Sequence, residues 1–109
     1  MRLFKKNEKG PGLAMSRSFG DSEGESIGIT AEPEVKEYLI KKEDKALIIA
    51  TDGLWEYTTN EQVANIAKNY WDKNDANVIV NELYKTAIEN WKKENCNIDD
   101  ITIICVILN

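Results

Sequence analysis

Two short, almost wholly apolar runs dominate the pattern of hydrophobic and polar positions along the chain. The first, residues 46–50, reads Ala-Leu-Ile-Ile-Ala and leads into an acidic turn. The second, residues 101–108, contains seven apolar residues among eight. Short apolar runs bounded by turn residues are typical of strands that are buried on both faces of a sheet. We therefore predict buried strands over residues 46–51 and 101–108.

Between these runs, apolar residues recur at helical spacing along two stripes. Two overlapping capping boxes fit the start of the first helix, Thr59 with Gln62 and Thr58 with Glu61. The polar residues 72–75 break the pattern and supply an N-cap for a longer second helix. The stripes consist of Val63, Ile66, Ala67, Tyr70 and Trp71 in the first helix, and of Ala76, Ile79, Val80, Leu83, Tyr84, Ala87, Ile88 and Trp91 in the second. We predict an αα-hairpin laid on the sheet, with both stripes in the core.

The patterns that precede the first apolar run are less regular. Residues 5–12 are basic and turn-rich, which indicates a mobile loop. Residues 27–30 and 35–40 look like strands, and Pro33 between them marks a join or a sheet edge because proline lacks a backbone N–H. The polar residues 41–44 predict a turn into the next strand.

Composition narrows the class of protein. The chain has 109 residues, of which 42% are hydrophobic and 30% charged, which is typical of one small globular domain or a piece of a larger one. Its net charge of −5 argues against a nucleic-acid partner. No apolar run reaches membrane-spanning length and no signal peptide is recognisable, so we expect no membrane partner. The spacing of Cys96 and Cys105 is not that of a metal-binding motif. A reducing compartment is the simplest inference, either the cytoplasm or the nucleus.

Histidine is absent from the chain, and its absence excludes several chemistries. No Ser-His-Asp or Cys-His nucleophile system can be complete here, and neither can a zinc site that uses histidine. If the chain takes part in catalysis, its carboxylates must carry the chemistry, or a histidine must come from another polypeptide.

Two acidic turns are the candidate chemical site. Asp52 follows the first buried strand, where Gly53 allows the backbone to bend, and Asp99 precedes the second. The two carboxylates face each other at one rim of the sheet only if the strands are antiparallel. Carboxylates held close together repel each other, and a divalent cation such as Mg²⁺ or Mn²⁺ relieves that repulsion. The alternative from these residues alone is that both acids are ordinary solvated caps of a structural domain.

Three motifs follow one another along the chain: Leu-Ala-Met-Ser-Arg-Ser-Phe-Gly-Asp at residues 13–21, Ala-Thr-Asp-Gly-Leu-Trp-Glu at residues 50–56 and Asp-Asp-Ile-Thr at residues 99–102. Together and in this order they resemble the motifs of the PP2C family of metal-dependent protein serine/threonine phosphatases. The resemblance implies an α+β fold, the C-terminal part of a four-layer α-β-β-α sandwich with antiparallel strands and a two-helix antiparallel hairpin. It also implies a centre of two or more Mg²⁺ or Mn²⁺ ions, whose bridging water attacks phosphoserine or phosphothreonine.

The same resemblance assigns roles to particular residues. Asp52 and Asp99 would be metal ligands, whereas Gly53, Arg17, Asp21 and Asp100 would support the site without acting as catalytic groups. No catalytic side chain is assigned within this chain, because the nucleophile would be a metal-activated water.

The chain also departs from the family pattern. Asp100 stands where the family usually has Asn, and Glu56 stands where it usually has Asp. The N-terminal half of the family's catalytic domain, with its other ligands, has no counterpart in residues 1–109.

We therefore predict that the chain is the C-terminal portion of a phosphatase catalytic domain. The complete protein would act on phosphorylated proteins, whereas the chain alone would be inactive. Uncovered sheet surfaces would favour self-association. The alternative is a pseudo-phosphatase that uses the fold as an interaction module.

Overall fold

The structure, a computed structural model, describes residue 12 and residues 14–108. The chain divides after Tyr38 into two units. The predicted mobile loop at residues 5–12 lies outside the described residues except for Gly12. None of the helices in the described part of the chain is long and apolar enough to cross a membrane.

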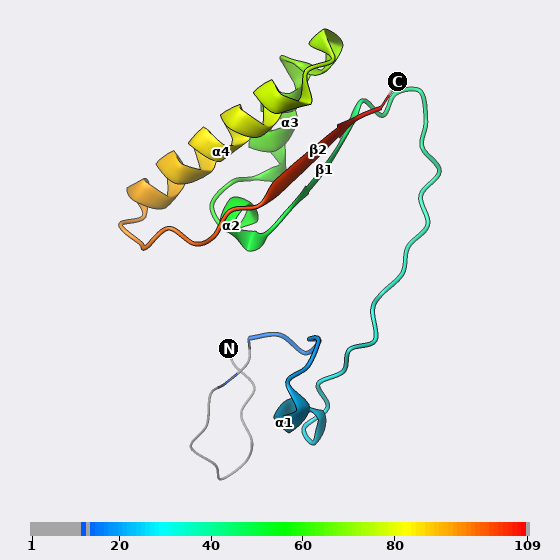
Figure 1. Ribbon diagram of the computed structural model, residues 1–109, viewed down its shortest axis with the longest axis vertical. Helices are drawn as coiled ribbons and strands as arrows, with labels where there is room; N and C mark the ends of the chain where they lie inside the picture. Colours follow the sequence, from blue (N-terminus) through cyan, green and yellow to red (C-terminus); the bar gives the residue numbers. More distant parts are fainter. Residues whose placement is uncertain (1–11, 13, 109) are drawn as a thin grey trace. The chain divides into compact units, whose positions relative to one another are not determined.

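The second unit contains the two strands that the apolar runs predict. Strand β1 (Ala46–Ala50) pairs with β2 (Ile103–Ile107) in an antiparallel ladder, with Ala46 opposite Ile107 and Ala50 opposite Ile103. Figure 1 shows the two strands side by side. Backbone hydrogen bonds continue the pairing at both ends, from Thr51 to the carbonyl of Thr102 and from Leu108 to that of Lys45. The antiparallel arrangement that the metal-site hypothesis requires is therefore present.

The helical hairpin is also as predicted. Helix α3 (Asn60–Lys68) begins with a complete capping box between Thr59 and Gln62, so the structure selects one of the two possible boxes. The neighbouring Thr58 is buried instead. A short 3₁₀ helix, η1 (Trp71–Lys73), connects α3 to α4 (Ala76–Lys93). The side chain of Asp75 caps α4 by accepting hydrogen bonds from the next helical N–H groups, those of Asn77 and Val78.

Both helices cover one face of the sheet and enclose the core (Figure 1). The buried positions of this core come from the predicted stripes and from the turn after β1: Leu54, Val63, Ala67, Ile79, Leu83 and Ala87. Alternate strand residues pack against them, namely Ile48, Ala50, Ile103, Cys105 and Ile107. We call this surface of the sheet the covered face. The hairpin on the sheet confirms the predicted α+β arrangement for this part of the chain.

The opposite surface of the sheet differs from the prediction. Its side chains, Leu47, Ile49, Ile104 and Val106, are 44–53% exposed, and we call this surface the open face. The prediction that both strands are buried on both faces is therefore wrong for this chain. The reason is that the described residues supply a layer of helices for one face only.

The first unit has little regular structure in the residues described. It contains a four-residue helix, α1 (Ser22–Glu25), and an isolated parallel bridge between Arg17 and Thr30. The predicted strand at residues 27–30 is thus reduced to one bridge, and the predicted strand at residues 35–40 is absent. A strand needs a neighbour for its backbone groups, and the only sheet among the described residues consists of β1 and β2.

Candidate metal centre

The acidic turn after β1 is a short helix, α2 (Asp52–Trp55), which starts at the end of the strand. Thr51 has an extended backbone (φ −74°, ψ 170°) and serves as the N-cap. Asp52 is the first helical residue, and its side chain is exposed. The indole N–H of Trp55 donates to the carbonyl of Ala50 at 3.0 Å, which fastens the helix to the strand. The sequence therefore places a solvent-accessible carboxylate on a rigid strand end.

Direct contacts join this turn to the segment that precedes β2. The hydroxyl of Thr51 donates to the carbonyl of Asp100 at 3.1 Å and accepts from the N–H of Thr102 at 3.1 Å. A Cβ atom on Gly53 would collide with the carbonyl oxygen of Asp100. Asp52 and Asp99 thus belong to two backbone segments that touch each other at one end of the ladder.

The role of Gly53 differs from the one that its sequence position suggests. Gly53 lies within helix α2, and it does not have the positive φ that would require glycine. Glycine is required because the backbone of Asp100 approaches so closely that no side chain fits. Gly53 and Asp100 therefore form a close backbone contact between the two acidic segments.

The donor chemistry of these segments suits a hard divalent cation. Asp99 is exposed, and one of its carboxylate oxygens accepts the N–H of Asp100 at 2.8 Å. Mg²⁺ in proteins is commonly held by one or two carboxylates and keeps several waters. Within residues 12 and 14–108, however, no group of three or more His, Cys, Asp or Glu side chains could hold a metal. The two aspartates alone therefore do not make a complete metal centre, and their role as ligands stays a prediction.

The other predicted supporting residues lie in the first unit, where their contacts are local. The guanidinium of Arg17 donates to the carbonyl of Glu32 at 3.0 Å and pairs with the carboxylate of Glu34 at 3.1 Å. Asp21 adopts a left-handed backbone (φ 52°) and accepts a hydrogen bond from the hydroxyl of Ser18. These contacts order residues 17–34 among themselves, and the supporting role of Arg17 and Asp21 at a metal site stays a prediction.

The sequence alone did not predict which side chains of α4 bind the acidic turn and the residues that follow it. The indole N–H of Trp91, near the end of α4, donates to the carbonyl of Gly53 at 2.7 Å. The side-chain amide of Asn90 donates to the carbonyl of Tyr57 at 2.9 Å. The stripe pattern indicated that Trp91 is a core residue, but no sequence pattern reveals that its partner is a backbone carbonyl.

Tyr57, which follows α2, makes two contacts of its own. Its ring meets the ring of Trp91 edge to face, with centroids 4.6 Å apart and an interplanar angle of 89°. Its hydroxyl lies 3.7 Å from the sulfur of Cys96, and this hydrogen bond raises the pKa of Tyr57. The segment after the acidic turn is therefore tied both to α4 and to the connection that leads to Asp99.

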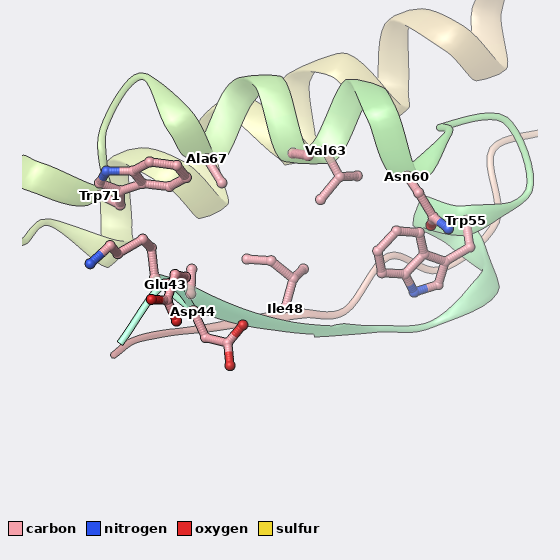
Figure 2. A pocket seen from close by; sticks show the side chains of 11 residues that line it. Glu43, Asp44, Ile48, Trp55, Asn60, Val63, Ala67 and Trp71 are labelled. Carbon is pink, nitrogen blue, oxygen red and sulfur yellow. The ribbon is translucent and has the colours of Figure 1, made fainter. Parts of the chain in front are cut away.

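A separate groove of about 370 Å³ lies between β1 and α3. Figure 2 shows Ile48 on one side of this groove, Val63 and Ala67 on the other, and Trp55 and Trp71 at its two ends. The lining is mainly apolar, and the carboxylates of Glu43 and Asp44 lie towards its Trp71 end (Figure 2). Neither Asp52 nor Asp99 lines this groove, so it is separate from the candidate metal centre.

Known proteins are similar to the chain in both sequence and fold. The family profile described as Protein phosphatase 2C matches residues 1–96. Probable protein phosphatase 2C 61 of Arabidopsis thaliana is 37% identical over 111 residues, and probable protein phosphatase 2C 48 of Oryza sativa subsp. japonica is 33% identical over 110 residues. The crystal structure of serine-threonine phosphatase 2C from Toxoplasma gondii superposes with a TM-score of 0.75 at 25% identity.

The coverage of these matches defines what the chain represents. The alignments cover 100% and 99% of this chain but 33% and 30% of the two plant proteins, and the structural match covers 92% of this chain and 31% of the Toxoplasma chain. The chain therefore spans about a third of the length of these relatives. It belongs to the protein phosphatase 2C family, whose members are metal-dependent protein serine/threonine phosphatases.

Proposed function

We propose that the protein to which this chain belongs hydrolyses phosphoserine and phosphothreonine in phosphorylated proteins, with Mg²⁺ or Mn²⁺ as cofactor. Family membership supports the reaction class. The observation that carries the role of this chain is the contact between the Thr51–Gly53 turn and the segment of Asp99 and Asp100. Two exposed carboxylates, from Asp52 and Asp99, are thereby available on adjoining segments.

In this proposal each residue has a distinct task. Asp52 and Asp99 supply metal-ligand oxygens, while Gly53 and Asp100 keep the two segments in contact. Arg17 and Asp21 support the neighbourhood of the site. When bound, the metal ions supply an activated water as nucleophile and neutralise phosphoryl oxygens. No side chain of this chain forms a covalent bond to phosphorus.

We propose further that residues 1–109 form the C-terminal portion of the catalytic domain and do not turn over substrate alone. Two carboxylates cannot complete a centre of two octahedral ions. In the complete domain, the open face would be covered as part of a four-layer α-β-β-α sandwich. In the isolated chain, the exposed apolar side chains of that face favour self-association.

Metal binding by variants of the chain tests the assignment of the ligands. Asp52→Asn and Asp99→Asn each remove one carboxylate while keeping the shape of the side chain, and Asp72→Asn removes an equal charge from exposed η1. Titration with Mn²⁺, followed by calorimetry, is expected to show affinity about tenfold weaker for the first two variants. Equal Mn²⁺ affinities in all three variants would mean that the ion responds to the overall negative charge and not to particular ligands. That result would favour an interaction module instead.

Activity measurements test the reaction and the incompleteness of the chain separately. With Mn²⁺ and a generic phosphoester, the 109-residue chain is expected to show no turnover. A phosphatase domain that contains this chain is expected to release phosphate from phosphothreonine peptides and to lose that activity in Asp52→Ala. Metal-dependent turnover by the 109-residue chain, abolished by Asp52→Ala, would contradict the proposal that the chain is incomplete.

A further inference from the structure

The carbonyl of Gly53 needs a partner from outside its own helix. Helix α2 ends at Trp55, and carbonyl groups in the last turn of a helix lack intrahelical donors. The indole N–H of Trp91 fills this need at 2.7 Å, in a buried bond. Trp91 itself is only 8% exposed. Because the bond is buried, removing the donor would leave an unsatisfied acceptor rather than a hydrated one.

Gly53 is therefore held from two directions. Trp91 binds its carbonyl, while the backbone of Asp100 closes on its Cα, where a side chain would collide. A shift of the turn away from Trp91 would also change its contact with Asp100. The position of one indole is thus linked through a single glycine to both acidic segments.

We propose that Trp91 is a positioning residue for the candidate metal centre: its N–H fixes the Asp52–Gly53 turn against the Asp99–Asp100 segment. The link to metal binding rests on the proposed function, whereas the link to the turn rests on geometry alone. Trp91 touches neither metal nor substrate and acts only through Gly53.

The surroundings of Trp91 hold its ring in one orientation. The ring of Tyr57 packs edge to face against it at 4.6 Å. Its neighbour Asn90 donates to the carbonyl of Tyr57 at 2.9 Å and to the hydroxyl of Thr58 at 3.4 Å. Residues at the end of α4 therefore bind the chain both within α2, at Gly53, and just after it, at Tyr57 and Thr58. This arrangement allows a rigid, 18-residue helix to set the place of the acidic turn.

A variant that removes only the N–H distinguishes positioning from simple core filling. Replacing Trp91 by 3-benzothienylalanine exchanges the indole N–H for sulfur and keeps the shape of the ring. Trp91→Phe is a simpler variant that also removes the donor. Trp71→Phe is the matched control, because Trp71 lies at the far end of the groove from Trp55 and α2 (Figure 2). All variants are made in the 109-residue chain.

Amide hydrogen exchange without metal is the primary measurement. The N–H of Leu54 bonds to the carbonyl of Thr51, and the N–H of Thr102 bonds to its hydroxyl, so both amides report on the contact. With the N–H of Trp91 removed, both are expected to exchange about tenfold faster relative to the core amide of Leu83. The Trp71→Phe control is expected to leave that ratio unchanged. An unchanged ratio in the benzothienylalanine protein would overturn the proposal.

Titration with Mg²⁺ separates failure of this proposal from failure of the proposed function. In the wild-type chain, amide shifts at Asp52 and Asp99 are expected to follow Mg²⁺, with affinity about tenfold weaker after loss of the N–H. If the wild-type shifts do not respond to Mg²⁺, metal binding by this chain is overturned, while the exchange ratio still decides whether Trp91 positions the turn. If exchange quickens but Mg²⁺ affinity stays the same, Trp91 has no role at the metal centre.

Discussion

The two faces of the β1–β2 sheet are similar in composition and opposite in surroundings. Ile48, Ile103 and Cys105 on the covered face pack against the helices, whereas Ile49 and Ile104 on the open face are each 53% exposed. Alternate residues of one strand therefore meet entirely different environments. The comparison shows that apolar content indicates where a strand can be buried, while the layers actually present decide where it is.

The largest expected difference between the faces is in stability. Leu83→Ala empties a fully buried position under the covered face and is expected to lower the free energy of unfolding by about 3 kcal/mol. Ile104→Ala on the open face is expected to change it by less than about 1 kcal/mol. Urea denaturation measures both values. Equal losses would mean that the open face is as well packed as the covered one.

At the end of the ladder, near Gly53, we expect the packing to be as tight as under the covered face. Gly53→Ala introduces a methyl group that collides with the carbonyl of Asp100, so it is expected to cost about 2 kcal/mol in unfolding free energy. Glu56→Ala changes an exposed residue of the same turn and should have an effect within about 0.5 kcal/mol. A neutral Gly53→Ala in the same denaturation assay would contradict the close approach.

The third prediction concerns association rather than folding. Ile49 and Ile104 lie opposite each other on the open face, and replacing both by Thr preserves strand propensity while removing apolar surface. Sedimentation velocity is expected to show concentration-dependent association of the wild-type chain that this double variant reduces. The accompanying loss of unfolding free energy is expected to be about 1 kcal/mol or less. A wild-type chain that stays monomeric at every concentration tested would show that the open face does not promote association.

The smallest expected effect is a difference in thiol reactivity. Cys105 lies on the covered face, where burial raises the pKa of its thiol and so lowers the fraction of reactive thiolate. Cys96 is exposed. Alkylation with iodoacetamide near neutral pH, mapped by mass spectrometry, is expected to modify Cys96 first. Faster modification of Cys105 would show that the covered face opens readily.

Much of the second unit could be predicted because its local and long-range signals agree. The capping sequences, the two stripes and the apolar runs all specify a helical hairpin on two strands, and the structure confirms this. The prediction of a strand at residues 35–40 was wrong, because it rested only on the strand propensity of these residues. Val35 and Leu39 are apolar but 81% and 86% exposed, and no neighbouring strand is present among the described residues.

The candidate site was predictable only in part, and the reason is physical. The sequence placed Asp52 and Asp99 at the same rim of the sheet only on the condition that the strands are antiparallel, and the observed ladder meets that condition. The true reason for Gly53 and the role of Trp91 could not be found in this way. Both depend on backbone carbonyls, those of Asp100 and Gly53, and every residue possesses such a group whatever its side chain.

The hydrogen bond from Thr51 to Asp100 joins residues 49 positions apart in the chain, and this separation affects the order of folding. Closing so long a loop is entropically unfavourable until the intervening helices have compacted it. We therefore expect the two acidic segments to meet late, after α3 and α4 have formed and docked. We expect that a folding chain does not bring Asp52 and Asp99 together before the hairpin is in place, so the contact between the two acidic turns marks completed folding of the second unit.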